Sequence, residues 1–163
     1  MNWSQYYASR VNSKSYEDYF ATKYSYLIDD VVNYVKQDSS ILIIEDGCGI
    51  GSVTKQLEKY LPYNKYLLFD NDPKMLKLSK KNLEAYKNTY FMKRNILSSP
   101  KICYLGKKIV ITHGVLEHFS DEHISQIVNG YLRSNIDQFH YVPTDGYTSP
   151  SFGDERLMSL TQW

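Results

Sequence analysis

The sequence predicts an α/β fold, a three-layer sandwich in which a mostly parallel sheet lies between two layers of helices. Short apolar runs typical of buried strands alternate with segments whose apolar residues recur at helical spacing. This alternation is typical of parallel strands with a helix between each pair. With 163 residues, 42% of them hydrophobic, the chain has the size and composition of one globular domain.

The first predicted elements are a long helix and a buried strand. Residues 15–37 are predicted to form one helix, with apolar positions at Phe20, Tyr24, Leu27, Ile28, Val31 and Val35. Residues 41–45 form an apolar strand that ends on Glu45. Another helix is predicted to begin at Ser52, with an apolar side made of Val53, Leu57, Tyr60 and Leu61.

The second strand and its helix carry clear boundary residues. Residues 66–69 are predicted as a buried strand that ends on Asp70. Asp72 has the residue type of a helix N-cap, and Pro73 follows at the first helical position. The helix is therefore predicted to run from Asp72 to about residue 87.

Three strands and one helix complete the predicted fold. The strands cover residues 89–93, 108–112 and 138–142, and Pro143 ends the last of them. Ser120 is a predicted N-cap, and the helix after it has an apolar stripe of Ile124, Ile127, Val128, Tyr131 and Leu132. The sheet is therefore expected to have five strands in this part of the chain.

Composition excludes several classes of function. The formal net charge of +1 provides no basic field for nucleic acid, which favours a small or neutral partner. Cys48 and Cys103 make neither a disulfide framework nor a Cys-x-x-Cys metal pair. No apolar run approaches the roughly 20 residues that span a membrane, and residues 1–14 are too polar for a signal peptide. We therefore expect a cytoplasmic protein without a membrane partner.

Three glycines at alternate positions follow the first strand, at Gly47, Gly49 and Gly51. Glycine permits positive φ and lets a ligand approach the main chain closely. The helix that follows directs its free N–H groups at this turn, which suits an anionic group. The turn predicts a nucleotide-type cofactor site, with a simple tight turn as the alternative. Ser52 stands where the dinucleotide fingerprint requires its third glycine, which argues against NAD.

Polar residues also follow three other predicted strands, and the carboxyl ends of parallel strands meet at one edge of a sheet. Asp70 is placed to accept hydrogen bonds from both ribose hydroxyls, or alternatively to cap the next helix. Asn95 could pair with the amino edge of an adenine, with Ile96 as an apolar face, or could bond only to its local backbone. Together with His113, these residues are expected to converge in one crevice.

Candidate catalytic residues lie just beyond the fourth strand. His118 could act as a proton acceptor, with Glu117 beside it and His113 lining the cofactor, although a structural role is the alternative for each. Glu117 and His118 supply only two plausible metal ligands, so we predict no metal site. Glu45 could orient the glycine turn, pair with an ammonium group of the ligand, or be a solvated strand end.

The chain resembles the class I S-adenosylmethionine-dependent methyltransferases in three motifs at the expected order and spacing. Residues 45–51 (EDGCGIG) look like the first motif of that family, residues 69–76 (FDNDPKML) are similar to its second, and residues 113–122 (HGVLEHFSDE) look like its fourth. The likeness covers residues 41–142, and residues 153–157 extend it.

The resemblance implies a Rossmann-like fold and S-adenosylmethionine as cofactor, with S-adenosylhomocysteine as product. The catalytic residues that it implies are His118 and Glu117. The cofactor-binding residues that it implies are Glu45, Asp46, Gly47, Cys48, Gly49, Gly51, Asp70, Asn71, Met75, Asn95, Ile96, His113 and Gly114.

The sequence departs from the family pattern in three places. Asn95 stands where members often have an acid that binds adenine, which still leaves a hydrogen-bonding group. The Asn/Asp-Pro-Pro-Tyr motif of enzymes that methylate amino groups of DNA bases or glutamine is absent. The last strands of the family fold are expected to be truncated or absent, because only about 20 residues follow Pro143. A homodimer or another partner could then cover the short sheet edge.

The expected function is methyl transfer from S-adenosylmethionine to O, N or C of a small-molecule acceptor. One domain, residues 1–163, is expected to comprise an N-terminal helical lid or cap (1–37) and a Rossmann-like core (38–163). The lid would place Tyr6, Tyr7, Tyr16 and Tyr19 over the acceptor, unless these tyrosines only pack on the first helix. The alternatives are a non-catalytic cofactor-binding module or partner subunit and, less favoured, an NAD-dependent oxidoreductase.

Overall fold

Five parallel strands form the sheet of the computed structural model, which describes residues 3–98, 101–147 and 154–163. The strands are β1 (Leu42–Asp46), β2 (Lys65–Asp70), β3 (Thr89–Lys93), β4 (Lys108–His113) and β5 (Asp137–Tyr141). They lie in the order β3-β2-β1-β4-β5, and every neighbouring pair is parallel. The strand order reverses at β1, so the crevice beyond its carboxyl end is the position where such sheets bind ligands.

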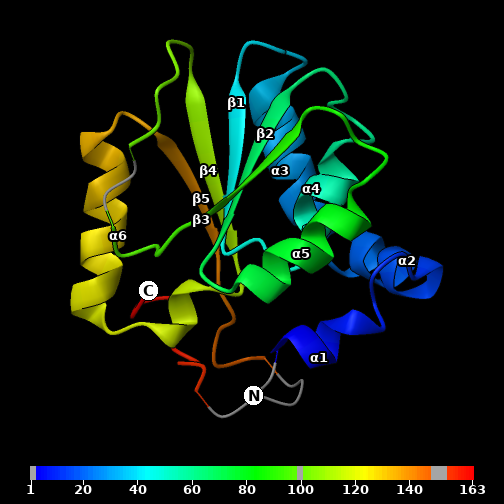
Figure 1. Cartoon of the computed structure of the whole chain (residues 1–163). Helices are drawn as coiled ribbons and strands as arrows, with labels where there is room; N and C mark the ends of the chain where they lie inside the picture. The colour runs from blue at the N-terminus through cyan, green and yellow to red at the C-terminus, as the bar shows by residue number, and fades with distance from the viewer. Residues whose placement is uncertain (1–2, 99–100, 148–153) are drawn as a thin grey trace.

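Helices cover both faces of this sheet. Figure 1 shows α6 (Asp121–Arg133) on one face and α3 (Ser25–Val35), α4 (Ser52–Leu57) and α5 (Pro73–Asn82) on the other. Neighbouring strand residues point to opposite faces, so Ile43 belongs to the core on the α3 side and Ile44 to the core on the α6 side. The predicted three-layer, Rossmann-like sandwich is confirmed.

The N-terminal segment differs from the prediction of one helix over residues 15–37. The structure has two helices, α2 (Lys14–Lys23) and α3, with the non-helical Tyr24 between them at φ −116° and ψ 24°. The Tyr24 ring packs against the ring of His113, with 4.4 Å between centroids. The prediction was wrong because the apolar stripe continues through the break without a glycine or proline to mark it. A short helix, α1 (Trp3–Ala8), precedes both.

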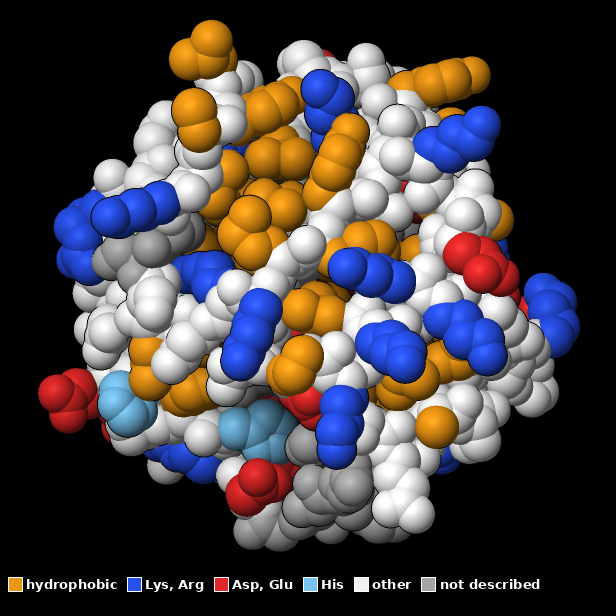
Figure 2. All heavy atoms as spheres, viewed as in Figure 1, with side chains coloured by type: hydrophobic (Ala, Val, Ile, Leu, Met, Phe, Trp, Pro, Cys, Tyr) orange, Lys and Arg blue, Asp and Glu red, His pale blue; other side chains and the backbone are white. Residues whose placement is uncertain are grey.

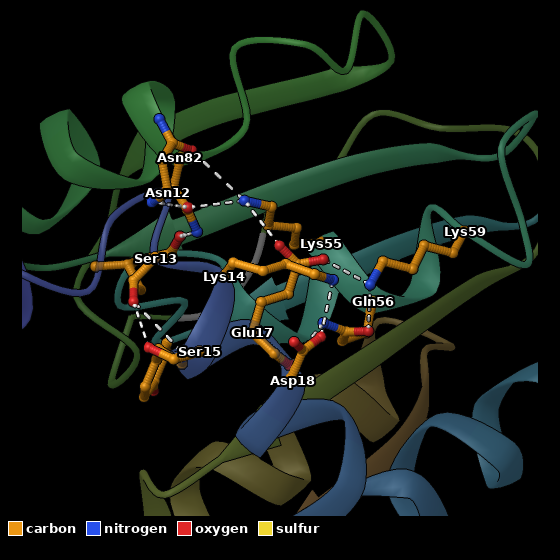
Figure 3. A network of polar contacts seen from close by, with 12 residues as sticks. Asn12, Ser13, Lys14, Ser15, Glu17, Asp18, Lys55, Gln56, Lys59 and Asn82 are labelled. Carbon is orange, nitrogen blue, oxygen red and sulfur yellow. Dashed lines mark hydrogen bonds and ion pairs between the residues drawn. The ribbon is translucent and has the colours of Figure 1, made fainter.

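A polar network fixes α2 to the layer of α4 and α5, as Figure 3 shows. The Glu17 carboxylate lies 2.6 Å from the ammonium of Lys59 and 3.4 Å from that of Lys55. The backbone N–H of Asn12 donates to the side-chain oxygen of Asn82 at 3.0 Å, and Lys55 donates to the same oxygen at 3.2 Å. These contacts hold α2 in place beside the carboxyl ends of the strands.

The α6 side of β3 has no helical cover. The described residues between β3 and β4 form no helix, and as a result Tyr90 is 52% exposed and Met92 is 57% exposed. Figure 2 shows hydrophobic side chains gathered on this face of the molecule, with Lys and Arg side chains around them. None of the described helices is long and apolar enough to cross a membrane.

Beyond β5, the described residues contain no further strand, only an isolated bridge between Thr144 and Met158. This agrees with the prediction that the last strands of the family fold are truncated or absent. Arg156 joins the C-terminal segment to the residues after β4: its N–H donates to the Glu117 carbonyl at 2.9 Å and its guanidinium to the Phe119 carbonyl at 2.7 Å. Gly153, part of the predicted motif extension, lies outside the described residues.

A buried ion pair joins the end of β1 to both of its flanks on the α6 side. The carboxylate of Asp46, 1% exposed, accepts hydrogen bonds from the guanidinium of Arg94 and from the hydroxyl of Tyr131. Arg94 also donates to the carbonyl of Ser98 at 2.6 Å and lies over the ring of Phe69, 5.1 Å from its centroid. The pair therefore connects β1, the chain after β3, and α6.

Replacing Arg94 with Met is expected to lower the free energy of unfolding by about 3–5 kcal/mol, because it leaves the Asp46 carboxylate buried without its cation. Adding Asp46→Asn removes that charge and is expected to recover part of the loss. Urea denaturation at pH 7 measures both, with the exposed Lys93→Met as the control expected within about 0.5 kcal/mol of the parent. A loss below about 1 kcal/mol for Arg94→Met would contradict this role.

Candidate functional site

A cavity of about 760 Å³ lies beyond the carboxyl ends of β1, β2 and β4, within the size range of small-molecule sites. We call this cavity the chamber. Its floor is formed by the glycine turn, its sides by the residues after β2 and β4, and its cover by tyrosines of α1 and α2. The crevice predicted from the sequence is thus a chamber with an aromatic cover.

The glycine turn adopts the left-handed conformation at all three glycines. The φ angles are 79° at Gly47, 54° at Gly49 and 73° at Gly51, values that residues with a Cβ adopt at a cost. The backbone N–H groups of Gly47 and Cys48 both donate to the Phe69 carbonyl, at 3.0 and 2.9 Å. The turn is therefore bonded to the end of the neighbouring strand, β2.

The three glycines differ in what surrounds them. A Cβ on Gly47 would lie 2.5 Å from a methyl group of Val115, and one on Gly51 would lie 2.6 Å from a methyl group of Leu83. A Cβ on Gly49 would meet no atom closer than 3.6 Å. Packing thus requires glycine at positions 47 and 51, whereas Gly49 leaves space on the chamber side that a ligand can fill.

Glu45 lines the chamber and also holds the helix that follows the turn. Its carboxylate, 5% exposed, accepts hydrogen bonds from the N–H of Thr54 at 3.1 Å and from the hydroxyl of Thr54 at 2.5 Å. Burial raises the pKa of Glu45 to about 7, against the lowering effect of the Thr54 hydrogen bonds. Of the predicted alternatives, the solvated strand end is wrong, because Glu45 is buried and bonded to α4.

Asp70 connects the end of β2 to the glycine turn. One carboxylate oxygen accepts from the N–H of Gly49 at 3.0 Å and the other from the N–H of Asp72 at 2.8 Å. Burial raises the pKa of Asp70. The predicted N-cap of α5 is confirmed at Asp72, whose side chain accepts from the N–H of Lys74 at 2.7 Å. Because Asp72 caps α5, Asp70 is not needed as the cap, and it lines the chamber.

Two histidines line the β4 side of the chamber. The His113 ring packs against Phe20 and Tyr24, and its pKa is lowered to about 4, first by burial and then by the positive charge of Lys23. His113 is therefore neutral at pH 7. The Nδ1 atom of His118 lies 3.4 Å from a carboxylate oxygen of Asp154, which can orient the imidazole in the chamber.

Glu117 lies beneath this region and does not line the chamber. A Cβ on Gly114 would be 3.6 Å from one of its carboxylate oxygens, which places the carboxyl group beside that turn. The other oxygen is buried and has no hydrogen-bond partner among the described residues. Burial raises the pKa of Glu117 to about 7. Glu117 therefore lies beside the loop of Gly114, outside the chamber lining.

The chamber brings together nine of the residues predicted from the sequence. They are Glu45, Gly47, Cys48, Gly49, Asp70, Met75, His113, Gly114 and His118. The tyrosines predicted as a lid, Tyr6, Tyr7, Tyr16 and Tyr19, line it as well.

Six predicted residues lie outside the chamber lining: Asp46, Gly51, Asn71, Asn95, Ile96 and Glu117. Asn71 and Asn95 are exposed, and the side chain of Asn95 accepts from the N–H of Leu97 at 3.0 Å. This local bond is the alternative that the sequence left open for Asn95. Ile96 packs in the core on the α6 side.

Sequence reasoning missed several residues of the lining. They are Ile50, Asp72, Val115 and Phe119 within the predicted motifs, Ser52 and Val53 directly after the first motif, and Phe20, Lys23, Tyr24 and Tyr147 in the cover. The first six could have been found from their positions in or next to the motifs. Phe20 and Tyr24 were read only as core positions, and nothing in the sequence around Tyr147 signals a role.

A family model described as a methyltransferase domain matches residues 43–134, which is more than half of the chain. The chain belongs to this methyltransferase family. The predicted resemblance to the class I S-adenosylmethionine-dependent methyltransferases is thereby confirmed.

Solved structures support the same fold. Magnesium protoporphyrin IX methyltransferase from Synechocystis PCC 6803, with bound S-adenosylhomocysteine, is 26% identical with a TM-score of 0.56, over 73% of this chain and 55% of that one. The small RNA methyltransferase HEN1 has a TM-score of 0.70 at 15% identity, over 85% of this chain and 20% of that one.

A further structure, PKMT2 from Rickettsia typhi in complex with S-adenosylhomocysteine, is 22% identical with a TM-score of 0.55, over 66% of this chain and 22% of that one. The methyltransferase domain described here thus spans between about a fifth and about half of the length of these three proteins. Among curated proteins, none matches its sequence significantly.

Glu45→Gln is expected to flatten the dependence of stability on pH. Because the pKa of Glu45 rises from 4.5 to about 7 on folding, the folded state retains a proton, and stability falls as pH rises between these values. Between pH 4.5 and about 7, Glu45 in the parent protein loses a contribution of about 3 kcal/mol to the free energy of unfolding. Urea denaturation from pH 4.5 to 8 measures it. Parallel pH curves for parent and variant would contradict a raised pKa at Glu45, whose neighbouring charge is Asp70.

Proposed function

We propose that this chain transfers a methyl group from S-adenosylmethionine to a small-molecule acceptor held in the chamber. One observation carries the proposal: Gly49, open to the chamber, is hydrogen-bonded through its N–H to the Asp70 carboxylate, so that the turn and the acid face one ligand site. Membership of the methyltransferase family supports the choice of cofactor.

The residues of the chamber floor fit this cofactor chemically. Gly49 lets the main chain approach the ligand, and Asp70 can accept hydrogen bonds from ribose hydroxyls. The buried Glu45 carboxyl group, deprotonated in the presence of a cation, can pair with the ammonium group of the methionine part. Met75 offers an apolar surface beside Gly49. Asn95 and Ile96 could contribute only if the segment held by Arg94 moved.

The cofactor supplies an activated methyl group on a sulfonium, so the chain has mainly to align the acceptor with it. Positioning of this kind accounts for a large share of catalysis in bimolecular reactions. Acceptors that are protonated at working pH must also lose a proton. We propose that His118 takes up this proton. His118 lines the chamber, and Asp154 can stabilise the imidazolium form of His118. Neutral His113 then serves as a wall of the chamber, and Glu117 lies beside the loop of Gly114.

The volume of the chamber supports a small acceptor. Tyrosines of α1 and α2 line the chamber opposite the acids and glycines of its floor, and its volume of about 760 Å³ is that of a small-molecule site. The solved relatives act on unlike acceptors, among them a protoporphyrin and small RNA according to their names. The formal net charge of +1 favours the small molecule over the RNA.

Calorimetric titration with S-adenosylhomocysteine is expected to show one binding site per chain, with micromolar affinity. Gly49→Ala is expected to weaken binding at least about tenfold, because its Cβ would occupy the open side of the turn. Gly146→Ala is the control for adding a Cβ at a glycine without positive φ outside the chamber, since a Cβ there meets nothing closer than 3.8 Å. Absence of binding by the folded parent protein up to high micromolar concentration would refute the cofactor assignment.

His118→Gln is expected to lower turnover by about 10²-fold or more on an acceptor that must lose a proton, because glutamine cannot act as a base. The measurement is release of S-adenosylhomocysteine by the parent and the variant on the best acceptor found in a panel. Affinity for S-adenosylhomocysteine should stay within about threefold. His123→Gln, an exposed histidine on α6, is the control. An equal loss of cofactor affinity and turnover would assign His118 to binding instead.

A further inference from the structure

An ammonium group in the cover of the chamber is surrounded by aromatic rings. The ammonium of Lys23, at the end of α2, lies 5.4 Å from the ring centroid of Tyr19, 5.6 Å from that of Tyr24 and 5.3 Å from that of Tyr147. All four residues line the chamber. Three rings contributed by different segments therefore hold one ammonium group at the chamber wall.

Lys23 takes part in none of the ion pairs formed by the described residues, and it is the single Lys or Arg among the described residues that line the chamber. Hydrogen bonding to Tyr19 raises the pKa of Lys23, so the group stays charged at neutral pH. Its nearest titratable neighbour on the sheet, His113, is neutral there.

The strand order separates this cation from the proposed cofactor contacts. Asp70 ends β2, on one side of β1, whereas His113 ends β4 and Tyr147 lies beyond β5, on the other side. The acids of the lining, Glu45, Asp70 and Asp72, all belong to the β1–β2 end. The chamber therefore has an acidic end at the glycine turn and a cationic, aromatic end at Lys23.

We propose that Lys23 and the rings of Tyr19, Tyr24 and Tyr147 bind the carboxylate of an aromatic acceptor. The proposal rests on the proposed function and names the class of its substrate. Tyrosine rings offer flat surfaces against which an aromatic ring can pack, and a partly desolvated ammonium pairs with an anion more strongly than an exposed one. A phenol that carries a carboxylate has both an aromatic ring and an anionic group. Its hydroxyl must lose a proton when it is methylated, and His118 is the proposed proton acceptor.

The test compares 4-hydroxybenzoate with its neutral counterpart 4-hydroxybenzamide, each titrated by calorimetry into the protein with and without S-adenosylhomocysteine. The parent protein is expected to bind the benzoate at least about tenfold more tightly than the amide. Lys23→Met should abolish this preference, and Lys23→Arg, which restores the charge, should retain it. Lys74→Met, at an exposed lysine of α5, is the matched control and should leave the preference unchanged.

Three results would overturn the proposal. The first is equal affinity of the parent protein for the benzoate and the amide, and the second is no binding of either compound up to about 10 mM. The third is that Lys23→Met weakens binding of S-adenosylhomocysteine but not binding of the benzoate. The last would assign Lys23 to the carboxylate of the cofactor. If S-adenosylhomocysteine fails to bind the parent, the proposed function fails, while the titrations without it still decide whether Lys23 selects a carboxylate.

Discussion

Two adjacent acids at the end of β1, Glu45 and Asp46, fix the glycine turn from opposite faces of the sheet. Successive strand side chains point to opposite faces, so Glu45 reaches Thr54 of α4 while Asp46 reaches Arg94 and Tyr131 on the α6 side. Each carboxyl group is buried, and each is bonded to a different layer. The turn that follows them is thus attached to both layers, and so is the floor of the chamber that it forms.

Much of the fold could be predicted from the sequence because strand and helix periods are local signals. The five strands, the N-caps at Asp72 and Ser120, and the meeting of strand ends in one crevice are confirmed. The break at Tyr24 could not be predicted, since the ring there packs against His113, which is 89 positions away along the chain and is brought near only by the fold. A periodic pattern carries no information on such a contact.

The site was predictable where backbone conformation demands a residue type, and less so where a side chain could face either way. The spacing of the glycines at 47, 49 and 51 predicts a turn with positive φ, and all three residues have positive φ. Asn95 and Asp46 follow motif positions, yet a hydrogen bond to Leu97 and an ion pair with Arg94 occupy their side chains. Whether such a residue faces a ligand or the protein depends on partners elsewhere in the chain.

The fixed position of α2 has a consequence for the order of events in a catalytic cycle. Glu17 holds α2 to Lys55 and Lys59, which keeps the rings of Tyr16 and Tyr19 in the lining of the chamber together with the glycine turn. A molecule seated on that turn would lie deeper than one seated among the rings. In the proposed enzyme the cofactor would therefore enter before the acceptor, and the methylated product would leave before S-adenosylhomocysteine, which is an ordered sequential kinetic scheme.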